Sequence, residues 1–354
     1  MECKKVIILG AGLTGLYLAH LLKKEKISFQ ILEARNRVGG RILTHYQKDS
    51  APIEMGATWF GEKHRKFKQV ISELNIHYFE QYLGNTAIYE PISSSPHQLV
   101  QLPPNDDPSF RIQGGTFELI KALTKKIAVD EIQLNEQVDR VEYSDKKFHV
   151  FTKNKNYYGE IVVSTLPPNL LVNSIEFMPQ LPENLVIVSQ NTHTWMGESI
   201  KIGLRFDAPF WRNDRLSGTI FSNVGPVTEM YEHNDVDDQF FALKGFLSGA
   251  YFSMSKDQRL EIVLNQLKKY YGDSVLHYRS YEELIWQNEN FTFQPYSGSI
   301  YPHQNNGNPI FQNSYCDNRL HIAGTETAQQ FGGYMEGAIQ SAEIVFDKIL
   351  KAIM

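Results

Sequence analysis

A glycine-rich motif near the start of the chain has the composition of a pyrophosphate-binding turn. Residues 5–9 (KVIIL) predict a buried strand, and they lead directly into residues 10–15 (GAGLTG). In such a motif Gly10 permits a tight turn, Gly12 lets the backbone approach a phosphate, and Gly15 lets the next helix pack on the strand. The N-terminus of that helix offers unpaired N–H groups and a positive dipole end to an anion.

The elements around this motif predict a βαβ unit. The helix is expected to continue to about residue 24, and a second strand over residues 28–32 ends at Glu33. An acidic residue roughly 20 positions after the turn can accept hydrogen bonds from a ribose hydroxyl. The whole pattern predicts a dinucleotide site, and its alternative is an ordinary βαβ unit with a glycine-rich turn. One such fingerprint is recognisable, so a second nucleotide site is not evident.

The segment after Glu33 is basic and contains two adjacent glycines. Residues 34–41 (ARNRVGGR) place Gly40 between charged neighbours that include Arg35 and Arg41. Glycines let backbone N–H groups come close to a phosphate, and arginines add forked donors. We expect the segment to complete a pyrophosphate cradle; a basic surface turn is the alternative.

One lysine lies inside an apolar stretch. Lys201 belongs to residues 200–204 (IKIGL), which predict a strand. A lysine with such neighbours normally extends its head group to water or finds a charged partner. In a dry site, however, its pKa would fall. The sequence alone leaves both interpretations open.

The composition is that of a globular enzyme of about two domains. The chain has 354 residues, 42% of them hydrophobic and 21% charged, and a net charge of −5 without a basic run, which argues against nucleic-acid binding. Two cysteines, Cys3 and Cys316, exclude a disulfide framework and supply no metal cluster, so we expect no metal and a reducing, cytoplasmic location. We expect neither a signal peptide nor a membrane span.

The order of predicted elements indicates a discontinuous arrangement of two domains. Segments 1–79, 112–180 and 291–354 are expected to form one α/β domain, and segments 80–111 and 181–290 a second. In the first domain we expect helices over 116–127 and 337–353, and strands near 132–134, 138–143, 148–151, 161–164 and 320–323. In the second we expect a strand over 199–206 and a helix over 256–271.

Motifs along nearly the whole chain resemble those of the flavin-containing amine oxidases, which include monoamine oxidases, polyamine oxidases and bacterial relatives. Besides the fingerprint, the matching segments are 37–41 (RVGGR), 54–59 (EMGATW), 114–116 (GGT), 163–168 (VSTLPP), 199–201 (SIK), 209–211 (PFW), 323–327 (AGTET) and 333–338 (GYMEGA). The last of these is most similar to monoamine oxidases.

The resemblance implies a two-domain α/β (α+β) fold, with a Rossmann-type FAD-binding domain and a discontinuous substrate domain of mixed sheet and helices. It implies FAD as the cofactor, with the helix that starts near Met335 directed at the flavin. The residues that it assigns to FAD are Gly10, Gly12, Gly15, Glu33, Arg35, Gly40, Arg41, Ala57, Thr58, Val138, Trp286, Gly324, Glu326, Tyr334 and Met335.

The resemblance also implies a reaction and three catalytic residues. Lys201 would hold a water against flavin N5, and Tyr301 and Tyr334 would face each other as an aromatic sandwich for the amine. The partners would be a small-molecule amine and oxygen. A hydride would pass from the amine to flavin N5, giving an imine, which water hydrolyses, and hydrogen peroxide.

Departures from the family pattern change what is expected. Ile300 stands where monoamine oxidases carry the cysteine that links the flavin, so we expect non-covalent FAD. A membrane-anchoring tail of the family is not recognisable, and the insert before residue 114 is short, which puts a deep, closed cavity in doubt.

The sequence leaves other activities open. An L-amino acid oxidase would need a cation for the carboxylate, for which Arg111, Arg205 and Arg212 are candidates. A related FAD oxidoreductase, such as a desaturase or porphyrinogen oxidase, and a non-catalytic FAD-bound module are further alternatives. The sequence names neither the amine nor the oligomeric state, and a homodimer is compatible with it.

Overall fold

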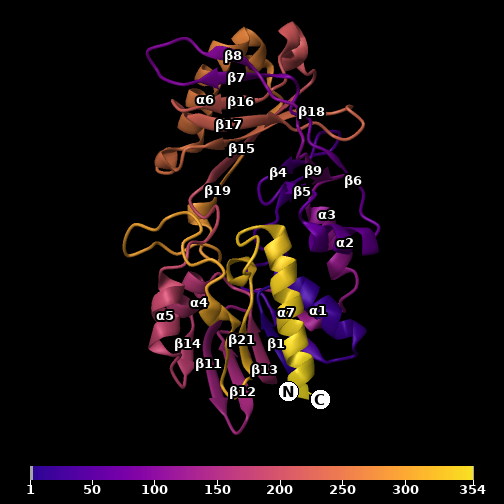
Figure 1. Ribbon diagram of the computed structural model, residues 1–354, viewed down its shortest axis with the longest axis vertical. Helices are drawn as coiled ribbons and strands as arrows, with labels where there is room; N and C mark the ends of the chain where they lie inside the picture. Colours follow the sequence, from indigo (N-terminus) through magenta and orange to yellow (C-terminus); the bar gives the residue numbers. More distant parts are fainter. Residues whose placement is uncertain (1–2, 354) are drawn as a thin grey trace.

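The protein consists of two units stacked along its long axis, as the computed structural model shows for residues 3–353 (Figure 1). One unit, the lower unit in Figure 1, is built on a nine-stranded sheet and contains both ends of the chain. The other, the upper unit, is built on a seven-stranded sheet. The predicted α/β class is therefore confirmed, with two sheets that share little of their core.

The lower sheet combines a parallel half with an antiparallel meander. Its order is β10-β2-β1-β13-β12-β11-β14, with β21 beside β13 and β20 beside β21. The strands of the parallel half are β10 (Ile132–Gln133), β2 (Phe29–Leu32), β1 (Lys4–Leu9), β13 (Asn156–Ser164) and β21 (Leu320–Ile322). The remaining strands are β11 (Val138–Ser144), β12 (Lys147–Thr152), β14 (Glu176–Met178) and β20 (Ser314–Tyr315).

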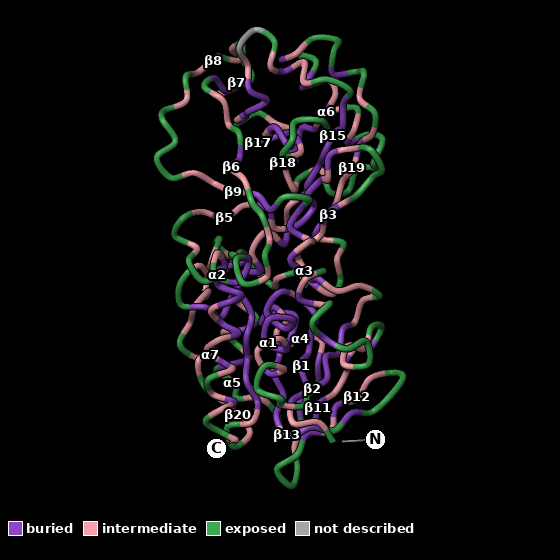
Figure 2. The backbone as a smooth tube through the Cα atoms, turned by 90° about the vertical axis from the view of Figure 1, so that its right-hand side faces the viewer, coloured by how far each residue is buried: buried purple, intermediate pink, exposed green. Residues whose placement is uncertain are grey.

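Helices cover both faces of this sheet, because its central strands are apolar on both sides. In β1, Val6 and Ile8 point into a core shared with α1 (Leu13–Lys24), α2 (Arg65–Glu73), α3 (Phe117–Thr124) and α7 (Met335–Ile353). Ile7 and Leu9 point into a second core with α4 (Pro168–Ser174) and α5 (Glu183–Gln190). Figure 2 shows the buried backbone concentrated along these strands and α1.

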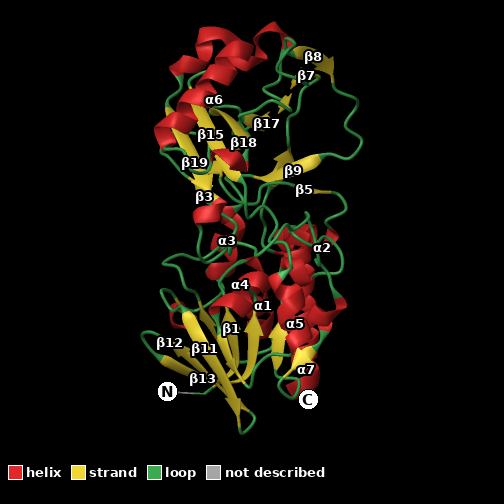
Figure 3. Ribbon diagram, turned by 90° about the vertical axis from the view of Figure 1, so that its left-hand side faces the viewer, coloured by secondary structure: helices red, strands yellow, loops and turns green. Residues whose placement is uncertain are grey.

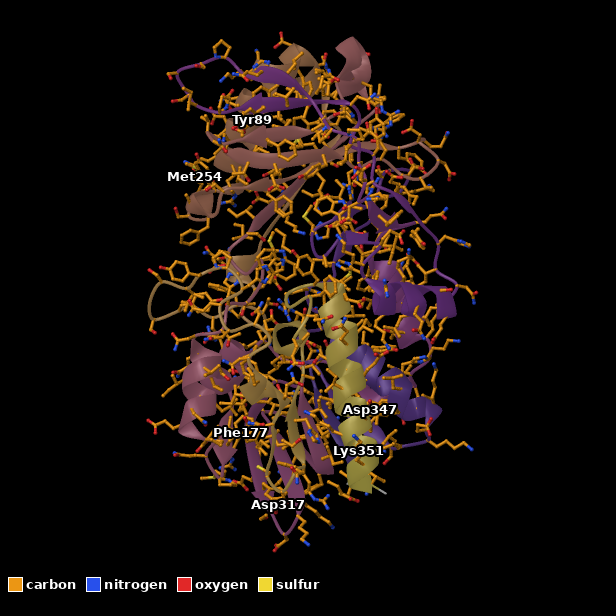
Figure 4. The ribbon with its side chains drawn as sticks, in the orientation of Figure 1. Tyr89, Phe177, Met254, Asp317, Asp347 and Lys351 are labelled. Atoms are coloured by element: carbon orange, nitrogen blue, oxygen red, sulfur yellow. The ribbon has the colours of Figure 1, made fainter. Side chains whose placement is uncertain are left out.

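The last helix also completes the start of an earlier one. The Glu336 carboxylate accepts hydrogen bonds from the backbone N–H groups of Lys66 (3.2 Å) and Phe67 (2.7 Å) in the first turn of α2. These N–H groups have no partner within their own helix. Farther along α7, Asp347 and Lys351 are exposed (Figure 4), so the helix is amphipathic, as its sequence predicts.

The upper sheet has the order β19-β15-β18-β17-β16-β7-β8. Its strands are β7 (Thr86–Glu90), β8 (Gln98–Gln101), β15 (Ile200–Phe206), β16 (Ile220–Ser222), β17 (Val227–Glu232), β18 (Phe241–Leu247) and β19 (Ser280–Ile285). Helix α6 (Lys256–Tyr271) packs on one face through Val263 and Leu267, which contact the apolar residues of β15 and β18 (Figure 3). The opposite face is directed at the lower unit.

Short strands lie between the two sheets. β5 (Phe60–Gly61), β9 (Ser109–Ile112) and β6 (Tyr78–Glu80) form a three-stranded sheet, and β3 (Thr44–His45) pairs with β4 (Ile53–Glu54). The segment from β4 to β5 runs beneath the free face of the upper sheet, where Ile53 packs against Ala242 of β18. It therefore bridges the two units.

One element lies apart from the unit expected for it. Helix α5 falls within segment 181–290, which the sequence assigns to the second domain. In the structure it packs on the lower unit, because Leu185 joins the apolar cluster of Leu171 and Val150. The chain therefore leaves the lower unit after α5 and not at residue 181. The predicted boundaries of α6 coincide with those observed, and α7 begins two residues earlier than predicted.

Close packing between α1 and β1 leads to a test of the glycine turn. A Cβ atom on Gly15 would lie 2.1 Å from the carbonyl oxygen of Gly10. Gly15→Ala should therefore push α1 away from the strand and lower the free energy of unfolding by about 1–3 kcal/mol, which thermal melting would detect. Gly298→Ala is the matched control, because nothing lies within 4 Å of the added methyl group there. Equal melting temperatures for the two variants would contradict this account.

Candidate active site

A single cavity of about 740 Å³ takes its walls from both units. In the lower unit the walls include the β1–α1 turn, the end of β2 and the start of α7. In the upper unit they include Lys201 of β15 and Phe246 of β18, with the β4–β5 segment between them. The cavity therefore extends from the dinucleotide fingerprint to the free face of the upper sheet.

Backbone groups dominate the fingerprint end. Gly10 has φ 103° and Gly40 has φ 55°, conformations that favour glycine. A Cβ on Gly40 would lie 3.1 Å from the Cα of Gly12, so the two turns approach closely. Helix α1 has no side-chain cap at Gly12, which leaves its first N–H groups available to an anion. This end of the cavity fits a pyrophosphate.

Glu33 lies at the end of β2 in the cavity wall, where the fingerprint predicts it. Its carboxylate accepts hydrogen bonds from the N–H groups of Ala11 (2.8 Å) and Arg35 (2.9 Å). These bonds hold the carboxylate beside the glycine turn with acceptor capacity left over for a ribose. The Arg35 guanidinium also lines the cavity, but it is bound to Glu289 and Thr292.

Arg41 in the cavity wall forms a bidentate ion pair with Glu326 behind it. The two guanidinium nitrogens lie 2.5 and 2.8 Å from the carboxylate oxygens, and Arg41 also donates to the backbone carbonyl of Trp195. Burial alone would lower the pKa of Arg41, but the Glu326 charge outweighs this and raises it. Arg41 lines the cavity, whereas Glu326 is fully buried behind it. Glu326 therefore orients Arg41 in this structure.

Lys201 lines the cavity at the other end. Alternation along β15 directs Ile200 and Ile202 into the upper core and Lys201 away from it, toward the β4–β5 segment. Its ammonium donates to the backbone carbonyl of Gly56, and its Nζ lies 5.1 Å from the centre of the Phe246 ring. Burial lowers the pKa of Lys201 to about 8, although the Glu54 charge opposes this. The lysine does not extend to bulk water.

Aromatic side chains form the wall near Lys201. Tyr334 and Trp195 both line the cavity, with ring centres 6.0 Å apart. Trp286 also lines it, and its indole N–H donates to the backbone carbonyl of Met55 (2.9 Å). Trp195 was missed by the sequence analysis, although it lies only six residues before Lys201 and within the segment that precedes that motif.

The structure does not bring Tyr301 opposite Tyr334, which corrects the predicted pair of tyrosines. The Tyr301 side chain is 76% exposed and lies outside the cavity wall. Its N–H donates to the Gln304 side chain, which in turn donates to the carbonyl of Asn191. These contacts hold residues 301–304 as a turn against the segment that carries Trp195, and Trp195 takes the position beside Tyr334.

The other predicted residues divide into two groups. Those in the cavity wall are Gly10, Gly12, Glu33, Arg35, Gly40, Arg41, Ala57, Thr58, Val138, Trp286, Gly324, Tyr334 and Met335, together with Lys201. Gly15 and Glu326 lie behind the wall as packing and pairing residues. The sequence analysis also missed wall residues contributed by the upper unit, Phe246 and Glu229.

The arginines considered for an amino-acid carboxylate lie elsewhere. Arg111 donates to the carbonyl of Asn234, Arg205 to that of Ala51, and Arg212 pairs with Glu232 and Asp238. None of the three is part of the cavity wall. The cations that do line the cavity are Arg35, Arg41 and Lys201.

Comparison with known proteins identifies the family. The model of the flavin-containing amine oxidoreductases matches residues 13–93 and 79–350. The chain belongs to this family. Its relatives include a probable flavin-containing monoamine oxidase A of Dictyostelium discoideum, 24% identical over 98% of both chains. An L-amino acid dehydrogenase of Synechocystis is 22% identical over 97% of this chain and 94% of its own length.

Solved structures of flavin amine oxidases share the fold. A cyclohexylamine oxidase from Brevibacterium oxydans superposes with a TM-score of 0.88 at 18% identity, covering 99% of this chain and all of that one. A putrescine oxidase superposes with a TM-score of 0.86 at 20% identity, covering 99% of both chains. Within residues 3–353, no helix is long and apolar enough to cross a bilayer.

The cavity of this amine oxidoreductase fits FAD, the cofactor that the family implies. Gly10, Gly12 and Gly40 bring two backbone turns close together in the cavity wall, where their N–H groups can face a pyrophosphate, and Glu33 is placed for a ribose. Ala57 and Thr58 line the cavity farther along, next to Lys201, which donates to the adjacent Gly56 carbonyl. The residues present therefore match a dinucleotide at one end and a ring system at the other.

The position of Glu33 predicts a specific loss of cofactor affinity. Glu33→Gln keeps the side-chain shape but removes the charge, so charge-assisted hydrogen bonds to a ribose should weaken. Such bonds contribute roughly 1.5–3 kcal/mol, so FAD should bind about 10- to 100-fold more weakly. Titration of the apoprotein by flavin fluorescence would measure this. Glu73→Gln, on the exposed side of α2, is the control. Unchanged affinity in Glu33→Gln would remove Glu33 from the cofactor site.

Proposed function

We propose that the protein is an amine oxidase that converts a small-molecule amine to an imine and reduces oxygen to hydrogen peroxide. The observation that carries this proposal is one cavity that joins the dinucleotide fingerprint to Lys201 and the Tyr334–Trp195 wall. Family membership supports it, because the matched model describes flavin-containing amine oxidoreductases. FAD, when bound in this cavity, would supply the two-electron oxidant for the amine, and oxygen would be the final electron acceptor.

The protein's own residues position the amine and exclude water. The π faces of Tyr334 and Trp195 attract the amine head group and restrict its orientation. Ala57 and Thr58 shape the opposite side, and Lys201 provides an ammonium that is held away from bulk water. We expect the protein to accelerate amine oxidation mainly by holding the reacting atoms in line.

We infer that the flavin is held without a covalent bond. Ile300 cannot form a thioether, and neither Cys3 nor Cys316 lies in the cavity wall. Cys316 lies in the turn between β20 and β21 and packs against the second core of the lower unit. Acid precipitation should therefore release all flavin colour into the supernatant; colour retained by the pellet would contradict this inference.

An amino-acid substrate is the second candidate, favoured by the relative named as an L-amino acid dehydrogenase. The structure offers it little support, because Arg111, Arg205 and Arg212 are bound elsewhere. The upper end of the cavity instead includes the Glu229 carboxylate and the Trp59 and Phe246 rings. A negative charge beside aromatic rings suits a cationic or neutral amine better than a carboxylate.

A flavin-reduction screen tests the function directly. Anaerobic protein should lose its flavin absorbance with at least one primary amine or polyamine, and readmitted oxygen should restore the absorbance and yield peroxide. L-amino acids form the second arm of the screen. Bleaching by amino acids alone would favour the second candidate, and no bleaching by any amine would overturn the proposed activity.

The aromatic wall predicts which ring substitutions should slow flavin reduction. Tyr334→Ser and Trp195→Ser should each slow anaerobic flavin reduction by about a hundredfold, because misplacing the amine by about an ångström has an effect of that size. Tyr334→Phe keeps the π face and should cost little. Tyr301→Ser is the matched control and should leave the rate unchanged, because that side chain is exposed. A defect in Tyr301→Ser as large as that in Tyr334→Ser would restore the pair of tyrosines, and a wild-type rate in Trp195→Ser would remove Trp195 from the site.

A further inference from the structure

A second lysine lies behind the cavity wall, next to Lys201. In the ladder between β15 and β18, Lys201 pairs with Phe246 and Gly203 pairs with Lys244. Residues two apart on a strand share a face, so Lys201 and Lys244 are diagonal neighbours on the free face of the upper sheet. Lys244 is fully buried and is not part of the cavity wall. The charge states of two buried lysines that lie so close together need a physical explanation.

Hydrogen bonds connect the two lysines through the β4–β5 segment. The Nζ of Lys244 lies 2.8 Å from the hydroxyl of Thr58, and that hydroxyl donates to the carbonyl of Gly56 at 3.1 Å. Lys201 donates to the same carbonyl. The Nζ atoms of both lysines also lie 5.1 Å from the centre of the Phe246 ring, and that of Lys244 lies 3.8 Å from the Trp59 ring. Both head groups therefore occupy one small buried region.

The surrounding charges do not balance two ammonium groups. From β4, Glu54 faces both lysines, and it accepts hydrogen bonds from the Thr44 hydroxyl and the Thr116 N–H. From β9, the Arg111 guanidinium also faces Lys244.

The other groups around Lys244 add no compensating charge. His233, which follows β17, contacts Arg111, and burial and the neighbouring cations lower its pKa well below the usual value. Tyr231 of β17 lies opposite Lys244 in the ladder, and its hydroxyl donates to Glu229 at the cavity. One carboxylate would therefore face three cations in a buried region if both lysines were charged, which is costly.

We propose that Lys201 and Lys244 hold one proton between them at neutral pH, with Lys244 as the neutral partner that keeps Lys201 an ammonium at the cavity wall. Lys244 is then a positioning residue, because it acts on the site through Lys201. The role of the two lysines in amine oxidation rests on the proposed function. The shared proton does not depend on that function.

The direction of the shared proton follows from the environment of each lysine. Burial lowers the pKa of both, and it lowers that of Lys244 well below its usual value. Lys201 lies at the cavity wall and donates to the Gly56 carbonyl, whereas Lys244 lies behind the wall beside the Thr58 hydroxyl and the Trp59 ring. The interaction between the two lysines raises the pKa of Lys201 and lowers that of Lys244, so the proton resides on Lys201. Such a pair titrates as a unit, in two widely separated steps.

Removing Lys244 should therefore weaken the hold of Lys201 on its proton. In Lys244→Met the ammonium of Lys201 loses the neighbouring amine that raises its pKa. A polar interaction with a charged group is worth about one to two pKa units. The proton affinity of Lys201 should fall about tenfold or more. Lys244→Gln retains an oxygen acceptor and should keep the pKa of Lys201 closer to that of the wild type. Lys268→Met, on the exposed side of α6, is the control and should change nothing.

Nuclear magnetic resonance of the full-length protein, selectively labelled at the lysine Cε and Nζ atoms, tests the proposal. The signals are assigned by their loss in Lys201→Met and Lys244→Met. Between pH 7 and 10 the wild type should show Lys201 titrating near pH 8 and Lys244 remaining neutral. In Lys201→Met, the remaining Lys244 should bind a proton more readily than in the wild type.

The titration of the wild-type protein tests the shared proton even if a variant fails to fold. Two lysines that each titrate independently near their ordinary pKa of about 10.4 would overturn the proposal. An unchanged Lys201 titration in folded Lys244→Met would do the same. These measurements use no amine, so they test the shared proton separately from the proposed function. If the shared proton is found but no amine bleaches the flavin, the proposed function is overturned and the proposal for the two lysines stands.

Discussion

Donors on the upper sheet that bind the backbone carbonyls of residues 51–56 hold the two units together. Arg205 donates to Ala51 (2.9 Å), Trp286 to Met55 (2.9 Å) and Lys201 to Gly56. Buried carbonyl groups without hydrogen-bond partners are costly, so these bonds fix the position of this segment against the sheet face. The cavity exists where it does because the same segment also forms its wall.

That constraint explains why polar residues face inward on an otherwise apolar sheet. On β15 and β18, the residues directed at α6 are apolar, whereas those directed at the lower unit include Lys201, Lys244 and Arg205. Each finds a fixed oxygen partner there. Preorganised charge in a water-poor region acts more strongly than the same charge in solvent. The fold therefore gathers polar side chains on the sheet face that borders the cavity, with Lys201 in the cavity wall itself.

Local signals allowed much of this arrangement to be predicted from the sequence. The positions of Gly10, Gly12 and Glu33 follow from a strand, a turn and a helix that are adjacent in the chain. Tyr301 could not be placed in this way, because its position depends on a contact between Gln304 and Asn191, over a hundred residues apart. Lys244 carries the same signal as Lys201, a lysine in an apolar strand, but only the register of the two strands shows that they are neighbours.

The cap that Glu336 provides for α2 has a consequence for the order in which the molecule can assemble during synthesis. The first turn of α2 is completed by a residue that leaves the ribosome some 270 positions later. The core around β1 likewise needs α7, whereas β15 to β19 are close together in the chain. Elements that await distant partners stay exposed for longer. The nucleotide-binding half, although its first strand is translated first, thus cannot complete its core until α7 has been made.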